Sequence, residues 1–153
     1  MLTISWAHLS GLGIILLPCL ITDLHNRTLP AVYMTICLII AGLVNRFVLH
    51  MDTVQMLAGG ILGAAFIGIA VVSRGEIGIG DGILITVLGV WCGFGTTLFM
   101  TLTALISAAA VGLAMLVIRK ENAKKEYPLA PFFVIPWAAL VIMRIAESAG
   151  GGV

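Results

Sequence analysis

Six stretches of apolar residues follow one another along the chain, separated by short polar segments. They cover residues 4–22, 29–49, 54–72, 82–94, 97–118 and 129–146. A helix that crosses a bilayer needs roughly 20 mostly apolar residues, and most of these stretches approach that length. The pattern therefore predicts six transmembrane helices joined by short loops.

The fourth and fifth stretches are almost continuous in the sequence. Residues 82–118 cover about twice the length of one bilayer crossing at about 1.5 Å per helical residue, so two passes fit them better than one. The glycine-containing segment Cys92-Gly93-Phe94-Gly95 is where we expect the chain to reverse direction.

Composition leads to the same class of protein. Of the 153 residues, 61% are hydrophobic and 10% are charged, whereas soluble domains have about 25% charged residues. The mean hydropathy is +1.18 and the net charge is +1, which excludes a water-soluble domain, a disordered chain and a nucleic-acid binder. We expect an all-α, polytopic protein that forms one domain, residues 1–153, embedded in a lipid bilayer.

Lysine and arginine are divided unequally between the two sets of loops. The loops after the first, third and fifth stretches hold six of these residues, and the opposite side holds only Arg46 and Arg144. Basic loops of membrane proteins stay in the cytoplasm, so both termini are expected on the extracytoplasmic side. No basic residue precedes the first stretch, and no small-x-small site follows it before Asp23. We therefore expect this stretch to remain as a helix and not to be removed as a signal peptide.

The small residues and the cysteines of the chain indicate helix packing and not a chemical site. Gly59, Gly63 and Ile67 form a row at four-residue spacing, with further small residues alongside it, and such a row allows helix backbones to approach closely. The three cysteines lie inside apolar stretches and form no CxxC pair. We therefore expect the cysteines to be buried, and we expect no metal site and no cofactor.

Two acidic residues lie where an apolar stretch meets the membrane boundary. Asp23 follows the first stretch, and Asp81 precedes the fourth. The predicted topology puts both at the cytoplasmic side, where they meet if the two helices are neighbours. Two carboxyl groups that share a site keep one proton between them and can activate a water molecule. The alternative is that each aspartate caps or anchors its own helix. A helix N-terminus favours this for Asp81, and a helix C-terminus disfavours it for Asp23.

The residues around both aspartates resemble a known family. Gly78-Ile79-Gly80-Asp81 matches the GxGD signature of membrane-embedded aspartic peptidases. Asp23, followed by Pro30, is similar to the D-x6-P segment of the type IV prepilin peptidases, and Pro128 and Pro131 are similar to the proline-rich entry of that family's last helix. The chain departs from the family pattern at Ala31 and Ile83, where the family usually has an asparagine or aspartate and a lysine.

The resemblance implies an aspartic endopeptidase of the inner (cytoplasmic) membrane. Its substrates would be prepilins or pseudopilins, cleaved at the cytoplasmic face, with Asp23 and Asp81 as the catalytic pair and Gly78, Gly80, Pro30, Pro128 and Pro131 as motif residues. Larger family members carry a CxxC-containing domain that N-methylates the product. This chain has no such motif, so no methyltransferase activity is expected. Two alternatives remain, a proton- or cation-coupled transporter that uses the aspartates as a relay and a non-catalytic assembly factor.

Overall fold

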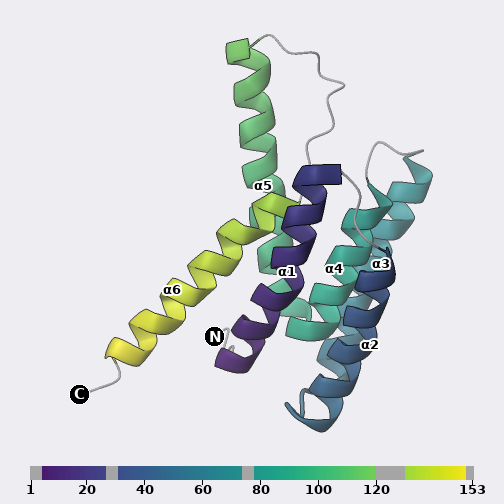
Figure 1. Cartoon of the computed structure of the whole chain (residues 1–153), viewed down its shortest axis with the longest axis vertical. Coiled ribbons are helices and arrows are strands. Elements are labelled where there is room, and N and C mark those ends of the chain that lie inside the picture. Colours follow the sequence, from purple (N-terminus) through teal and green to yellow (C-terminus); the bar gives the residue numbers. More distant parts are fainter. Residues whose placement is uncertain (1–4, 27–30, 74–77, 120–129, 151–153) are drawn as a thin grey trace.

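The chain folds into a bundle of six α-helices (Figure 1). The computed structural model describes residues 5–26, 31–73, 78–119 and 130–150, and no strand occurs among them. The helices are α1 (Trp6–Asn26), α2 (Ala31–Phe47), α3 (Thr53–Val72), α4 (Ile79–Cys92), α5 (Phe94–Arg119) and α6 (Val134–Gly150), and a 3₁₀ turn, η1 (Ala130–Phe133), precedes α6. The predicted all-α class and the number of helices are confirmed.

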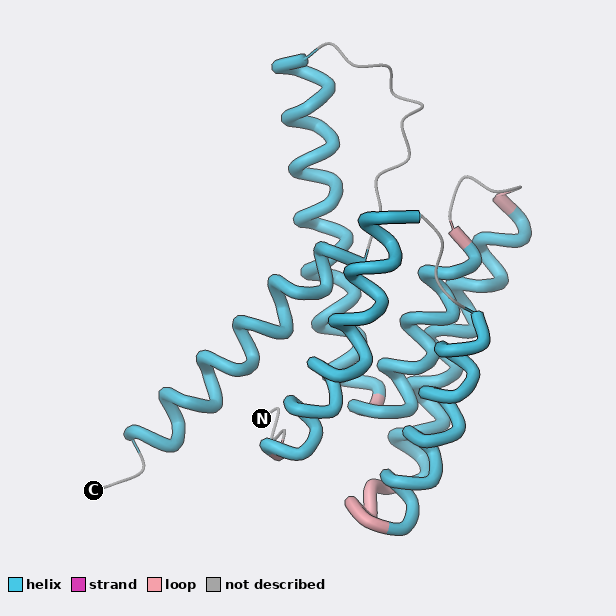
Figure 2. Tube along the Cα trace, in the orientation of Figure 1, coloured by secondary structure: helices cyan, strands magenta, loops and turns pink. Residues whose placement is uncertain are grey.

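Four of the helices are long and apolar enough to cross a membrane, namely α1, α3, α5 and the segment Pro131–Ala149 that contains α6. The helices α2 and α4 are apolar but shorter. The chain is therefore a multi-pass membrane protein. Figure 2 shows the α2–α3 loop and the α4–α5 turn at one end of the bundle, whereas α1 and α3 end and α4 begins at the other. Which end faces the cytoplasm stays a prediction.

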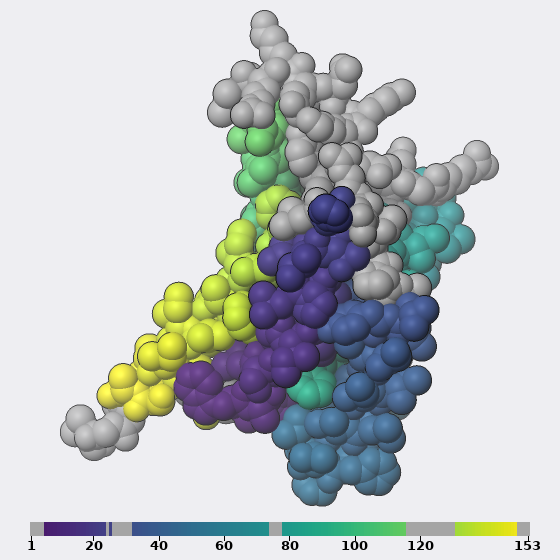
Figure 3. Space-filling view, in the orientation of Figure 1, coloured from purple at the N-terminus to yellow at the C-terminus, as the bar shows by residue number. Residues whose placement is uncertain are grey.

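Helix α4 lies at the centre of the bundle. It contacts α1, α2, α3 and α5, and most of its residues from Gly82 to Cys92 are buried. In the space-filling view α1 and α2 cover most of it (Figure 3). By contrast, only Gly59, Gly63 and Ala70 are buried on α3, and exposed side chains such as Leu57 and Ile61 are those expected of a helix that has one face toward lipid. The central position of α4 explains why it is apolar on every side.

The close approach of α3 and α4 depends on glycine. A Cβ atom added to Gly59 would overlap the backbone of Gly89, and one added to Gly89 would overlap the backbone of Gly59. A Cβ atom on Gly63 would likewise overlap the backbone and side chain of Thr86, and one on Gly82 would lie 2.7 Å from Ile67 Cγ1. The row of small residues predicted on the third stretch is confirmed as a helix–helix contact.

The chain reverses between α4 and α5 at Gly93, as predicted. Its φ of 77° and ψ of 173° are unfavourable for residues that carry a Cβ atom. The last carbonyls of α4 lack helical partners there, and the side chain of Asn45 on α2 supplies two donors. Its Nδ2 donates to the carbonyl oxygens of Val90 (2.7 Å) and Trp91 (2.8 Å). A buried side chain thus closes this end of α4.

Several helix boundaries differ from the sequence prediction, including the start of α5, which is Phe94 and not residue 97. The first helix continues to Asn26 and does not end before Asp23. The fourth begins at Ile79, three residues earlier than predicted, and ends at Cys92 instead of residue 94. The last begins at Val134, after a 3₁₀ turn that contains Pro131, and ends at Gly150 instead of residue 146. Hydropathy locates the apolar core of a helix and not its polar end turns, which explains these errors.

Candidate active site

Asp23 lies in the last turn of α1 and is buried, with 6% of its surface exposed. The helix extends through it to Asn26. The hydroxyl group of Thr22 donates to the carbonyl oxygen of Pro18 at 2.7 Å. The adjacent His25 is exposed. A carboxyl group is therefore held inside the bundle at the C-terminal end of a helix, where a simple capping role is unfavourable.

Asp81 lies in the first turn of α4 and is partly buried. Gly78 is the N-cap residue, and the backbone N–H of Asp81 donates to its carbonyl oxygen at 3.1 Å. The carboxyl group of Asp81 folds back over this glycine, because a Cβ atom at position 78 would lie 3.1 Å from Asp81 Oδ2. The small size of Gly78 leaves room for the carboxyl group.

The two glycines of the GxGD motif have ordinary backbone conformations. Gly78 has a φ of −66° and a ψ of 124°, which any residue adopts. Gly80 is part of the first turn of α4. Backbone freedom is therefore not the reason for either glycine. The space that Gly78 leaves beside Asp81 is a sufficient reason for the first glycine.

The two carboxyl groups lie at the same end of the bundle, one in the last turn of α1 and the other in the first turn of α4. Their helices are neighbours in space, since α1 contacts α4. The fold thus brings these two residues, which are distant in sequence, to the same end of neighbouring helices, and that they form one site stays a prediction. Because both groups are partly or wholly removed from water, two negative charges at this position are unfavourable.

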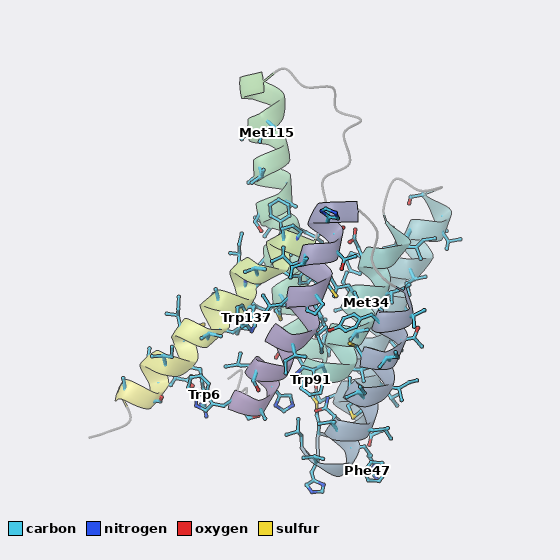
Figure 4. The ribbon with its side chains drawn as sticks, viewed as in Figure 1. Trp6, Met34, Phe47, Trp91, Met115 and Trp137 are labelled. Carbon is cyan, nitrogen blue, oxygen red and sulfur yellow. The ribbon has the colours of Figure 1, made fainter. Side chains whose placement is uncertain are left out.

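The N-terminal half of α1 is held by two tryptophans from different helices (Figure 4). Trp91 Nε1 on α4 donates to the carbonyl oxygen of His8 at 2.9 Å, and its ring lies against Gly11. Trp137 Nε1 on α6 donates to the carbonyl oxygen of Leu9 at 3.0 Å. These contacts fix α1 between α4 and α6, and the packing role predicted for these tryptophans agrees with them.

The C-terminal half of α1 is held by α2. Pro18 lies inside α1 and has no N–H to donate to the carbonyl oxygen of Ile14. The hydroxyl group of Tyr33 donates to that oxygen at 2.8 Å. One residue after Pro18, Cys19 Sγ lies 3.8 Å from Met34 Sδ. Neither Tyr33 nor Asn45 was predicted from the sequence, although a proline inside an apolar stretch signals a free carbonyl that needs a donor.

The remaining motif residues are only partly described. Pro30 and Pro128 lie outside the described residues, and Pro131 belongs to η1. Ile83, at the position of the family's lysine, is partly buried and packs against the core. All three cysteines are buried, as predicted. Within the described ranges, no three His, Cys, Asp or Glu side chains gather in a way that would hold a metal ion.

The fold is that of a multi-pass helical membrane protein with two acidic side chains brought together inside it. The sequence model of the type IV leader peptidase family matches residues 11–113, which is more than half of the chain and includes both aspartates. The protein belongs to this family, and it is a peptidase of the type IV leader peptidase kind. No curated protein and no solved structure matches the chain.

Proposed function

We propose that the protein is an aspartic endopeptidase that removes the leader from prepilin-like precursors at the cytoplasmic face of the inner membrane. Asp23 and Asp81 form its catalytic pair. The observation that supports this proposal is that α1 and α4, which contact each other, carry a buried and a partly buried carboxyl group at the same end of an apolar bundle. Ionisable groups at such positions are costly, and they mark functional sites.

The proposed chemistry follows from one proton shared by the pair. The ionised carboxylate takes a proton from a water molecule, whose oxygen attacks the peptide carbonyl carbon. The protonated carboxyl group gives its proton to the carbonyl oxygen, which produces a gem-diol. The carboxyl group that received the water proton then protonates the amide nitrogen. The C–N bond breaks as the other carboxylate takes its proton back from a hydroxyl group of the gem-diol. One acid and one amine are formed, and the pair again holds one proton.

The surroundings of the pair favour this chemistry. Gly78 leaves room for the carboxyl group of Asp81, because a Cβ atom at position 78 would lie 3.1 Å from Asp81 Oδ2. The positions of Gly80, Pro30, Pro128 and Pro131 along the chain complete the family's motif. We expect no cofactor, because two carboxyl groups are sufficient for this hydrolysis. We also expect no methyltransferase activity, because the CxxC motif of that domain is not in the sequence.

Cleavage of a precursor in cells tests the proposal directly. The full chain is co-expressed with a prepilin, and precursor size is followed by immunoblot in variants Asp23→Asn and Asp81→Asn. Each variant keeps the size of the side chain but removes the acid, and we expect conversion to fall by about 100-fold or more.

A matched control is available at the other end of the bundle. Asp52 is the N-cap of α3 and accepts a hydrogen bond from the N–H of Val54 at 3.2 Å. Asparagine caps helices about as well as aspartate, so Asp52→Asn should process the precursor like the parent. Conversion that survives Asp23→Asn or Asp81→Asn would reject the catalytic role of that residue. A parent chain that never converts any precursor would favour the transporter or assembly-factor alternative.

A further inference from the structure

The carbonyl group of Ile14 has an unusual donor. In a regular helix it would accept a hydrogen bond from the N–H of residue 18, but that residue is proline. The side chain of Ile14 is 69% exposed and points to the lipid side of α1. A carbonyl group next to lipid has no water to replace the lost N–H. The hydroxyl group of Tyr33 on α2 supplies the donor, at 2.8 Å.

We infer that Tyr33 is a positioning residue for Asp23. By donating to the oxygen that Pro18 leaves free, Tyr33 ties α1 to α2 at the proline and fixes the direction in which the last turns of α1 carry Asp23 toward Asp81. This inference rests on the proposed peptidase function, because it gives Tyr33 a role in placing one member of the catalytic pair. Tyr33 itself takes no part in the chemistry.

The segment between Pro18 and Asp23 is a short piece of continuous helix, so a change of direction at Pro18 displaces Asp23. The hydroxyl group of Thr22 donates to the carbonyl oxygen of Pro18, and helical structure continues to Asn26. Five residues correspond to about 7.5 Å of helix. A change of about 10° in helix direction at Pro18 would therefore move Asp23 by about 1 Å, and displacements of this size reduce catalytic rates by up to about 100-fold.

Contacts between sulfur atoms also join α1 to α2, but they define the direction of α1 less well than the Tyr33 hydrogen bond does. Cys19 Sγ and Met34 Sδ are 3.8 Å apart. Contacts to sulfur are weak and adaptable, whereas a hydroxyl-to-carbonyl bond has a defined geometry. For this reason the hydroxyl group of Tyr33, and not the neighbouring sulfur atoms, sets the direction of the last turns of α1.

A double-mutant cycle tests this inference, since Pro18 leaves the carbonyl oxygen of Ile14 without its helical donor and Tyr33 supplies the replacement. The full-length protein is purified as parent, Tyr33→Phe, Pro18→Ala and the double variant. Tyr33→Phe should lower kcat about tenfold with little change in KM, and lower the midpoint of thermal unfolding by several degrees. Alanine at position 18 restores an N–H for the Ile14 carbonyl. Within that background, Tyr33→Phe should change kcat by less than about twofold.

Equal effects of Tyr33→Phe in the two backgrounds, or no effect in either, would overturn the inference. Pro18→Leu also restores the N–H and serves as a second background if Pro18→Ala does not fold. The thermal measurement needs no substrate, so the hydrogen bond is tested even if the protein is not a peptidase.

The position of Asp23 can also be measured without catalysis. Cysteines are placed at positions 23 and 81 of a chain whose three native cysteines are replaced by alanine, and a short bismaleimide joins them. We expect Tyr33→Phe to reduce the yield of the cross-link and Pro18→Ala to restore it. A cross-link that forms equally well with and without the hydroxyl group would show that Tyr33 does not position residue 23. If the cross-link yields change as expected but the parent protein cleaves no precursor, only the peptidase function is rejected.

Discussion

The two aspartates of the candidate active site are carried by helices that are held in different ways. Asp81 is on α4, whose backbone packs directly against the backbone of α3 through Gly59 and Gly89. Asp23 is on α1, which packs through apolar side chains and accepts single hydrogen bonds from side chains on α2, α4 and α6. One carboxyl group is therefore on a helix supported through backbone contacts, and the other is on a helix supported through side chains.

This difference has a physical basis. Contacts between glycines cannot be adjusted without moving a whole helix, because backbone atoms have no alternative rotamers. A tyrosine or tryptophan that donates to a carbonyl group can rotate away, and such interhelical hydrogen bonds contribute only about 0.6 kcal/mol on average in membrane proteins. We therefore expect changes between α3 and α4 to affect the whole fold, and changes around α1 to affect the geometry of the pair.

The largest effect is expected at the backbone contact. In Gly89→Leu, the new side chain has to enter space filled by the backbone of Gly59, which should destabilise the protein by about 3 kcal/mol or more and abolish activity. Thermal unfolding in detergent measures this. Gly68→Leu is the control on the same helix pair, because a Cβ atom there meets nothing within 4 Å. If both variants unfold alike, the α3–α4 contact is not the rigid support described here.

A smaller effect is expected at the buried end of α4. Asn45→Leu keeps the approximate volume but removes the donors to the carbonyl oxygens of Val90 and Trp91. Leaving buried carbonyl groups unpaired should reduce the free energy of unfolding by about 1–3 kcal/mol. Asn45→Gln, which keeps the amide group, should reduce the free energy of unfolding by a smaller amount. A leucine variant as stable as the parent would mean that α4 is held by its glycine contacts alone.

Trp91→Phe examines the side-chain support of α1. Phenylalanine keeps an aromatic ring against Gly11 but cannot donate to the carbonyl oxygen of His8. That oxygen still has its helical donor, so the loss should be about 1 kcal/mol or less. We expect cleavage to fall by a few-fold while the protein remains folded. A collapse comparable to that of Gly89→Leu would remove the distinction between the two supports.

The smallest effect is expected at Thr97→Val, on the α4–α5 side. The hydroxyl group of Thr97 donates to the carbonyl oxygen of Leu88 at 3.1 Å, and that oxygen already belongs to the ladder of α4. Valine has nearly the same shape, so stability should fall by about 0.5 kcal/mol and cleavage should not change. Measured kcat and unfolding midpoint provide the check. A large loss of kcat would place Thr97 closer to the chemistry than its position indicates.

The sequence was sufficient for the parts of the fold that depend on hydropathy and spacing. Six apolar stretches, the reversal at Gly93 and the contact row of Gly59 and Gly63 all follow from residue type alone. The proximity of Asp23 and Asp81 follows from topology, because alternate loops lie on the same side of a membrane.

Other features depend on tertiary partners that no local pattern identifies. Asn45 looks like an isolated polar residue near the end of an apolar stretch, and its role depends on where α4 ends. The donor for the Ile14 carbonyl comes from another helix. Pro18 therefore indicates that a donor is missing but does not identify the residue that supplies it. The sequence prediction ends the first helix before Asp23, because hydropathy locates only the apolar part of a helix, whereas α1 continues to Asn26.

The length of α4 has a consequence for the position of its ends. Its 14 residues measure about 21 Å, compared with about 30 Å for the hydrocarbon layer of a typical bilayer. Because α4 is surrounded by α1, α2, α3 and α5, at least one of its ends lies below the membrane surface within the protein. Neighbouring helices, and not lipid, therefore fill the remaining thickness of the membrane around it.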